Sequence, residues 1–211
     1  MKFSIKEALA NISALTPKLI FLTGKSGTGK SHFSNILSDK HGYKLLELDT
    51  IVRAVAKKYG VGSAPDYAPA FAAYKGGLTQ EFRNEFISEI HSFIEKHSSN
   101  PIIIEGAISN AQMVRDIFSK QYTVFSFVYL YPTDMKKYAD RMMKRFKLDK
   151  KMGTRTLSIW PETPPEIEKA PVSSPKVKQF IAKMAQESKK KSDERYKYFV
   201  NNKFNIYTVS V

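Results

Sequence analysis

Short apolar runs and longer amphipathic stretches alternate along this chain of 211 residues. Among these runs, the one at 102–105 is apolar without alternation, as is typical of a strand covered on both faces. The last of them alternates apolar and polar positions. From this pattern we predict five strands, at residues 18–23, 44–49, 102–105, 123–130 and 204–211.

Apolar residues at helical spacing occupy most of the intervals between these runs. The spacing predicts helices at residues 3–15, 32–39, 50–58, 79–97, 133–147 and 176–200. Two stretches show little periodicity. We interpret residues 60–78 as a flexible segment on the substrate side, in which Tyr67, Phe71 and Tyr74 either line an acceptor pocket or pack together. Residues 148–175 are basic and then proline-rich, which indicates an ordered loop or lid.

Strands that alternate with helices predict an α/β fold, in which helices cover both faces of a parallel sheet in a three-layer sandwich. The length suits one domain, 1–211, with a lid and insert at about 141–175. In such sheets, ligands bind at the carboxyl ends of the strands. Side chains that follow the predicted strands are therefore the first candidates for chemistry.

A phosphate-binding motif, G-x-x-x-x-G-K-S, lies directly after the first predicted strand and before a helix. Glycines let the backbone wrap closely around phosphates, and the helix N-terminus adds partial positive charge. Lys30 can reach the β- and γ-phosphates, while the Ser31 hydroxyl can hold Mg²⁺. A glycine-rich turn with a chance lysine is the alternative, but every fixed position is present. We predict a nucleoside triphosphate site made of Gly24, Lys25, Ser26, Gly27, Thr28, Gly29, Lys30 and Ser31.

Acidic residues follow the second and third predicted strands. We expect Asp49 to end strand two and to accept the proton of an attacking hydroxyl, while Arg53, four residues on, holds the acceptor. The alternative for Asp49 is an acid that only caps a helix or stabilises its first turn. Glu105 ends strand three and, with Ser31, is a candidate ligand for Mg²⁺ or for the acceptor. The alternative for Glu105 is a strand-end acid that faces solvent.

A basic helix follows the fourth predicted strand. Arg141 and Arg145 share one face of it, and arginines from a closing lid can neutralise charge on a transferring phosphoryl group. A solvated basic surface is the alternative. The four histidines show no metal-ligand spacing, and we interpret them as surface or helix-face residues.

The composition excludes several kinds of site and bears on the compartment and partners of the protein. The absence of cysteine excludes disulfides, thiolate zinc sites and a cysteine nucleophile, and it favours the cytoplasm. No run is long enough to span a membrane, and the N-terminus lacks the apolar core of a signal peptide. The net charge of +14 favours polyanionic partners, including nucleic acid, although a lysine-rich solvated surface has the same composition.

Taken together, these segments resemble the P-loop kinase superfamily, which contains nucleoside, nucleotide and small-metabolite kinases. The matching segments are 24–31 (the Walker A motif), 46–53 (acid plus downstream arginine), 102–106 (apolar residues before Glu-Gly, as in uridine kinases) and 129–132 with Arg141 and Arg145. The resemblance implies a P-loop NTPase fold with sheet order 2-3-1-4-5. Family members usually continue past strand five with a loop that touches adenine, whereas this sequence stops at Val211. We therefore expect either that the lid region or another chain contacts the base, or that this sequence is a shortened form of the protein. The proline-rich insert at 161–175 also departs from the pattern.

The resemblance implies an ATP- and Mg²⁺-dependent kinase. A base at Asp49 suits a hydroxyl acceptor, so we expect a nucleoside or nucleotide substrate. A polynucleotide hydroxyl, including one on a modified base, is the alternative within this class. A non-catalytic nucleotide-binding module is the alternative outside it. A GTPase is disfavoured because the nearest match to its base-reading motif, residues 202–205, lacks the final acid.

Overall fold

The computed structural model describes residues 2–14, 18–58, 80–106, 108, 111–118, 125–152 and 163–211. Its strands form one sheet in which every pair of neighbours is parallel. The strands are β1 (Lys2–Ser4), β2 (Leu19–Gly24), β3 (Lys44–Glu47), β4 (Ile102–Glu105), β5 (Ser126–Tyr131) and β6 (Ile206–Ser210). Their order is β1-β6-β5-β2-β4-β3.

The sheet confirms the order expected for the five predicted strands and adds a sixth. Counted from β2, the order 2-3-1-4-5 is that of β3-β4-β2-β5-β6. The added strand β1 pairs with β6, so that Phe3 lies opposite Val209. The predicted helix at 3–15 was therefore wrong at its start, because three residues at the edge of a sheet give no periodic signal. The strand forms because it pairs with β6, which lies at the other end of the chain.

The second predicted strand was too long. β3 ends at Glu47, and the next helix begins at Leu48, so Asp49 lies in a helical first turn instead of at a strand end. The reason is tertiary: Leu48 is buried against Gly106, which follows β4. The alternation of Leu46, Leu48 and their polar neighbours looks like a strand in the sequence, but packing turns the chain two residues earlier.

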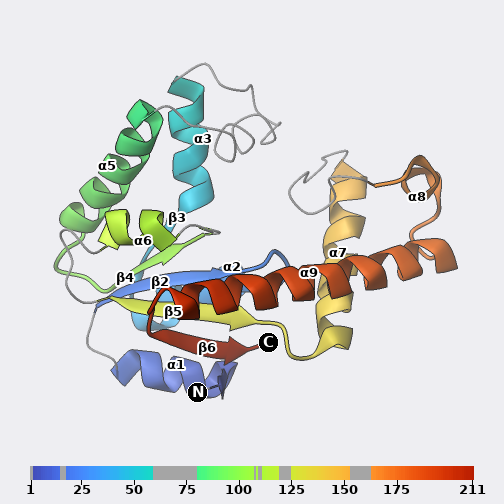
Figure 1. Cartoon of the computed structure of the whole chain (residues 1–211), viewed down its shortest axis with the longest axis horizontal. Helices are drawn as coiled ribbons and strands as arrows, with labels where there is room; N and C mark the ends of the chain where they lie inside the picture. Colours follow the sequence, from blue (N-terminus) through green and yellow to red (C-terminus); the bar gives the residue numbers. More distant parts are fainter. Residues whose placement is uncertain are drawn as a thin grey trace.

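Helices fill both sides of the sheet (Figure 1). They are α1 (Ile5–Ala14), α2 (Lys30–His41), α3 (Leu48–Lys58), α5 (Gln80–Lys96), α6 (Ala111–Phe118), α7 (Met135–Met152), α8 (Pro165–Lys169) and α9 (Pro175–Asn201). The eight-residue α6 was not predicted, although its inner side is buried. The predicted segment at 60–78, with Tyr67, Phe71 and Tyr74, lies outside the described residues.

Alternate residues of the central strands face two different cores. Phe21 and its partners on one face pack with α3, α5, α6 and the C-terminal part of α9. Ile20 and Leu22 face the other side, where they pack with α1 and α2. This two-residue period with both faces apolar is expected of a sheet buried in the middle layer of a sandwich. It fixes which helices can reach the carboxyl edge of β2.

A third apolar cluster joins α7, α8 and the N-terminal half of α9 beyond the sheet edge (Figure 1). The predicted lid and insert, about 141–175, falls largely on this cluster, while residues 153–162 lie outside the described chain. Part of the expected loop is helical. Pro165 and Pro175 each lie in the first turn of a helix, where proline is well tolerated, and Ser174 caps α9 by accepting from Val177 N–H at 3.3 Å.

Within the part of the chain that the structure describes, no helix combines the length and apolar character needed to cross a membrane.

Candidate active site at the phosphate loop

The loop between β2 and α2 needs glycine for steric and conformational reasons. Gly24 ends β2 with φ of 153°, and a Cβ there would lie 2.8 Å from the Leu130 carbonyl oxygen on β5. Gly29 is the N-cap of α2 with φ of 89°, a left-handed conformation that glycine adopts without penalty. The fixed glycines of the motif therefore let the backbone turn sharply into the helix.

A single backbone carbonyl accepts several hydrogen bonds inside this loop. The Lys25 carbonyl accepts from Thr28 N–H at 3.3 Å, from the Thr28 hydroxyl at 2.7 Å and from Lys30 Nζ at 3.3 Å. Lys30 thus folds back over the loop from the first residue of α2. The loop is closed by its own hydrogen bonds, which include the one from its lysine.

The charge of Lys30 is set by its surroundings. Burial lowers the pKa of Lys30, the carboxylates of Glu105 and Asp49 raise it in part, and Arg195 lowers it further. These four side chains come from α2, β4, α3 and α9. The pKa of Lys30 on α2 is therefore influenced by charged side chains from three other elements.

Glu105 ends β4 beside the loop, with Leu22 of β2 as its register partner. Its carboxylate is buried and accepts from the Ser31 hydroxyl at 3.1 Å and from the Ser34 hydroxyl at 2.8 Å. Burial raises the pKa of Glu105, while the bond from Ser34, the charge of Lys30 and the bond from Ser31 oppose the shift. The alternative of a solvent-facing acid was wrong.

Asp49 and Arg53 lie one turn apart on α3, and both are exposed. Asp49 is a first-turn acid, as the structural alternative proposed, yet its charge still raises the pKa of Lys30. The start of α3 packs closely against the residue that follows Glu105. Leu48 lies so near Gly106 that a Cβ on this glycine would be only 2.5 Å from Leu48 Cδ1. Asp49 therefore acts electrostatically on the loop lysine, although the local structure around it differs from the prediction.

The two arginines of α7 occupy different surroundings. Arg141 Nε donates to the Gly27 carbonyl at 3.0 Å, and burial lowers the pKa of Arg141. Its Nη2 is buried without a hydrogen-bond partner among the described residues, which leaves a donor for an anion at the loop. Arg145 lies one turn further on and pairs with Asp149 at 3.0 Å. The structure thus brings Arg141 to the loop, whereas Arg145 is held by its own helix.

Three residues at this site were missed in the sequence. Ser34 lies one turn after Ser31, a spacing that could have indicated its shared bond with Glu105. Tyr138 donates to the Ser26 carbonyl at 2.8 Å from α7, and Arg195 acts on Lys30 from α9. Neither Tyr138 nor Arg195 has a sequence signal, because each is more than 100 residues from the loop.

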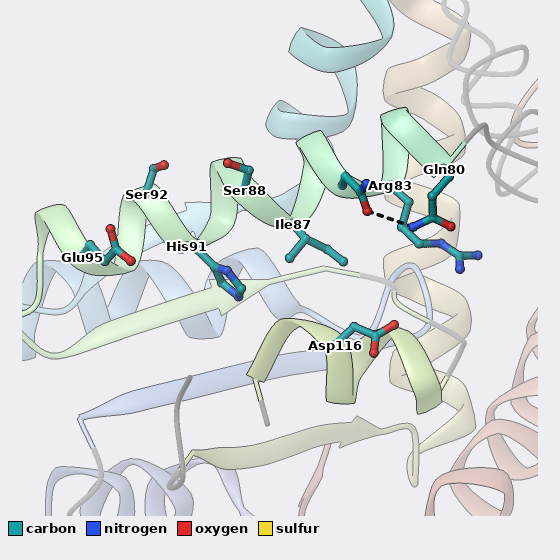
Figure 2. Close-up of a pocket in the computed structure, with 9 residues that line it drawn as sticks. Gln80, Arg83, Ile87, Ser88, His91, Ser92, Glu95 and Asp116 are labelled. Carbon is teal, nitrogen blue, oxygen red and sulfur yellow. Dashed lines mark hydrogen bonds between the residues drawn. The ribbon is translucent and has the colours of Figure 1, made fainter. Parts of the chain in front are cut away.

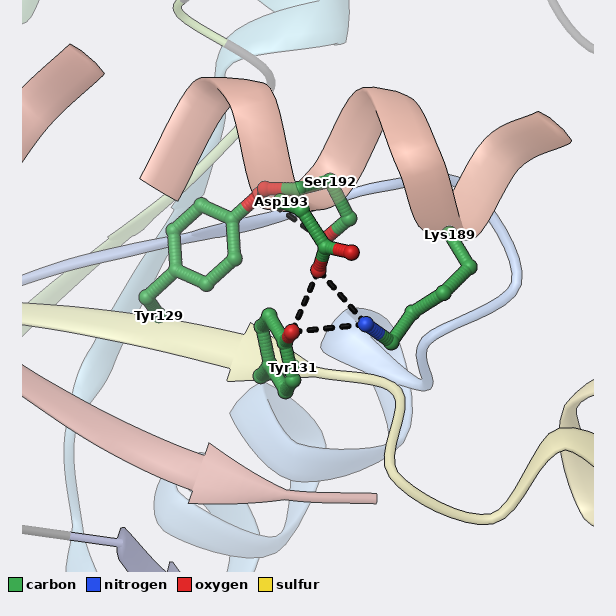
Figure 3. A network of polar contacts seen from close by, with 5 residues as sticks. All are labelled: Tyr129, Tyr131, Lys189, Ser192 and Asp193. Carbon is green, nitrogen blue, oxygen red and sulfur yellow. Dashed lines mark hydrogen bonds and ion pairs between the residues drawn. The ribbon is translucent and has the colours of Figure 1, made fainter. Parts of the chain in front are cut away.

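Polar contacts fasten α9 to β5 beside the site (Figure 3). The Tyr129 hydroxyl bonds to the Ser192 carbonyl at 3.1 Å and its hydroxyl at 3.0 Å. Tyr131 donates to Asp193, and Lys189 Nζ lies 2.6 Å from both the Tyr131 hydroxyl and Asp193 Oδ1. These bonds join α9 to the last residues of β5.

A hollow of about 430 Å³ lies elsewhere, between α5 and α6 (Figure 2). Arg83 and His91 of α5 and Asp116 of α6 help to line it, and none of its lining residues belongs to the phosphate loop. His91 Nε2 lies 2.7 Å from the Ile117 carbonyl, so this histidine joins the two helices. This hollow is therefore separate from the loop, where Lys30 and the buried Glu105 lie.

The parallel sheet order, the strand–loop–helix at residues 19–41 and the glycine-rich turn define a P-loop NTPase fold. A family model described as an AAA domain, AAA_18, matches residues 20–161, and the chain belongs to this family. The matched region contains the loop, Asp49, Glu105 and both arginines of α7. No curated protein is similar enough in sequence to count as a relative.

Several solved structures are similar to this chain at low sequence identity. A sugar kinase from Janibacter sp. HTCC2649 is 19% identical with a TM-score of 0.41, over 60% of this chain and 66% of that one, just under two thirds of its length. A gluconokinase from Sinorhizobium meliloti 1021 is 17% identical with a TM-score of 0.40, over 84% and 95%. An uncharacterized protein from Eubacterium ventriosum ATCC 27560 is 12% identical with a TM-score of 0.46, over 92% and 89%.

Proposed function

We propose that the protein is an ATP-dependent kinase that transfers the γ-phosphoryl group to a hydroxyl of a nucleoside or nucleotide. The observation that carries the proposal is the convergence at one loop of Lys30, the buried Glu105, the charge of Asp49 and the unpaired Nη2 of Arg141 among the described residues. Phosphoryl transfer depends mainly on positioning and on neutralising charge, and this group of side chains supplies both.

Each residue has a role in this proposal. The loop amides and Lys30 hold the phosphates, and Arg141 neutralises charge that builds up on the γ-phosphoryl oxygens. Asp49 takes the proton of the acceptor hydroxyl as its oxygen bonds to phosphorus and the bond to the ADP oxygen breaks. Arg53 orients the acceptor. Arg145 joins Arg141 only when its pair with Asp149 opens.

The oxygen donors near the loop fit Mg²⁺. The Ser31 hydroxyl and Glu105 carboxylate lie 3.1 Å apart, and both are hard oxygen ligands of the kind that Mg²⁺ binds together with phosphates and water. Ser31 would hold the ion directly, and Glu105 would hold it directly or through water. The ion supplies charge neutralisation at the phosphates when it is bound.

A polynucleotide hydroxyl is the second candidate acceptor, and the distribution of charge favours it. Helices α7, α8 and α9 carry 17 Lys and Arg against 7 Asp and Glu, a net +10 of the +14 of the whole chain. All three helices belong to the cluster beside the loop. A basic surface next to the site suits a long polyanion, and its binding would weaken steeply with salt.

The test is transfer from labelled ATP to a panel of nucleosides, nucleotides and 5′-hydroxyl or base-modified oligonucleotides, at two salt concentrations. We expect Lys30→Ala to abolish transfer and Asp49→Asn to reduce it strongly, because each removes a charge at the reacting groups. Lys40→Ala and Asp39→Asn change exposed residues near the other end of α2 and serve as matched controls.

The outcomes separate the candidates. Transfer to nucleosides or nucleotides supports the proposal, and transfer to oligonucleotides that collapses with salt supports the second candidate. Full turnover in Asp49→Asn would remove the proposed base. Tight ATP binding without transfer to any acceptor would favour a non-catalytic nucleotide-binding module.

A further inference from the structure

We propose that Tyr138 is a positioning residue for the phosphate loop: its hydroxyl fixes the Ser26–Gly27 peptide so that the Gly27 N–H faces the bound triphosphate. This inference rests on the proposed function only in that the loop binds a nucleotide tail. Tyr138 is fully buried on α7, and its hydroxyl lies 2.8 Å from the Ser26 carbonyl and 2.7 Å from Ser188 Oγ on α9.

The direction of each hydrogen bond follows from chemistry. A carbonyl oxygen only accepts, so the single hydroxyl proton of Tyr138 goes to Ser26. Tyr138 therefore accepts from the Ser188 hydroxyl, which must donate. Burial raises the pKa of Tyr138, so this proton stays in place at any pH at which the enzyme would work. Both bonds of the Tyr138 hydroxyl are thus assigned.

Because of the geometry of the peptide bond, this contact also determines where the Gly27 N–H points. In a planar trans peptide, the C=O of one residue and the N–H of the next point in opposite directions. With the Ser26 carbonyl held toward α7, the Gly27 N–H points to the opposite side of the loop. Among backbone contacts of the described residues, the Gly27 N–H has no acceptor. A loop of this kind uses such amides as phosphate donors.

The neighbouring peptide behaves differently, which makes Gly27 the amide that depends on Tyr138. Arg141 Nε holds the Gly27 carbonyl, and the N–H of that peptide, Thr28 N–H, is used inside the loop by the Lys25 carbonyl. The Tyr138 ring also packs on the loop, since a Cβ on Gly27 would lie 3.3 Å from both Tyr138 Cε2 and Met142 Cγ. Ring and hydroxyl have separable roles, because phenylalanine keeps the first and loses the second.

The chain contains a matched control for a purely structural role. Tyr129 is also fully buried, and its hydroxyl also bonds to a serine of α9, Ser192, but it makes no hydrogen bond to the loop among the described residues (Figure 3). Tyr129→Phe therefore removes an equivalent buried hydroxyl and an equivalent tie to α9. Ser188→Ala removes the α9 partner of Tyr138 and leaves its bond to Ser26.

The experiment measures the Kd of wild type, Tyr138→Phe, Tyr129→Phe and Ser188→Ala for ATP, ADP and inorganic triphosphate by calorimetry, together with Tm. We expect Tyr138→Phe to raise Kd about tenfold, equivalent to about 1.4 kcal/mol, because a charge-assisted bond loses its orientation. The rise is the same for all three ligands, which share the phosphate tail. Tyr129→Phe and Ser188→Ala keep the wild-type Kd even where Tm falls.

Unchanged Kd in Tyr138→Phe, or an equal rise in Tyr129→Phe, overturns the inference. A wild-type protein that binds none of the three ligands overturns this inference and the proposed function together, whereas wild-type binding with an unaffected Tyr138→Phe overturns this inference alone. A second measurement needs no variant. The amide resonance of Gly27 in ¹⁵N-labelled wild type shifts strongly on binding triphosphate, and an unmoved resonance contradicts the assignment.

Discussion

Ser34→Ala tests whether the buried Glu105 is ionised in the folded protein. Ser34 is fully buried on α2, and its hydroxyl donates to Glu105 Oε2 at 2.8 Å. Alanine keeps the Cβ and leaves no cavity larger than one oxygen atom. The change therefore removes the hydrogen bond to Glu105 and the longer contact, 3.2 Å, from the same hydroxyl to the Ser31 carbonyl.

The magnitude follows from the charge of the acceptor. A hydrogen bond to a charged group is worth about 1.5 to 3 kcal/mol, against about 1 kcal/mol for a neutral one. With Glu105 ionised, we expect the free energy of unfolding to fall by about 2 kcal/mol. For a chain of this length, that corresponds to a fall in Tm of roughly 4 to 8 °C.

The loss must depend on pH. Burial raises the pKa of Glu105, so the folded protein favours the protonated acid, and ionisation costs stability as pH rises through that pKa. The Ser34 bond opposes the shift, and its removal raises the pKa of Glu105 further. The destabilisation caused by Ser34→Ala is therefore largest at about pH 7 and shrinks toward about pH 4, because protonation of the carboxyl in the folded protein turns the bond from Ser34 into one with a neutral acceptor.

Urea denaturation of wild type and variant at both pH values measures this difference. Ser38→Ala, one turn further along α2, is the control and should show a small loss that does not change with pH. In the Glu105→Gln background, the Ser34→Ala loss should drop to that of a neutral bond, about 1 kcal/mol. An equal loss at the two pH values, or an undiminished loss in the double variant, would refute the reasoning.

Three further predictions have defined outcomes. Gly106→Ala should lower the free energy of unfolding by about 1 to 3 kcal/mol in urea denaturation, because the new Cβ would meet Leu48 Cδ1 at 2.5 Å. A loss below roughly 0.5 kcal/mol, which is typical of neutral surface changes, would contradict this packing. Gly24→Ala should destabilise more than Gly29→Ala: its Cβ lies 2.8 Å from the Leu130 carbonyl, whereas nothing lies within 4 Å at Gly29, which keeps only its backbone strain of about 1 kcal/mol. Asp193→Asn should lower stability by less than about 1 kcal/mol at neutral pH, since the pair is partly exposed. Burial raises the pKa of Asp193, but the hydrogen bonds from Lys189 and Tyr131 outweigh burial and lower it. The wild type therefore loses this contribution to stability as the pH falls through that pKa. In acid, the wild type and Asp193→Asn should have the same free energy of unfolding.

Local patterns were sufficient for much of the fold. The apolar runs predicted β2, β4 and β5, because strands buried on both faces are largely apolar, and the alternation at the end of the sequence predicted β6. The fixed glycines placed the loop, since the backbone at Gly24 and Gly29 accepts no other residue without strain. The motif also located Lys30 and Ser31, whose roles depend on their distance along the chain from those glycines.

Only the tertiary structure decided which distant side chains reach that loop. The end of β3 depends on Leu48 meeting Gly106, and β1 exists because Lys2–Ser4 finds β6 at the other end of the chain. Tyr138 and Arg195 come to the loop through the packing of α7 and α9, which carries no periodic signal for the residues it brings together. The physical reason is that local sequence encodes backbone conformation and burial, whereas contacts between residues far apart depend on how whole elements pack.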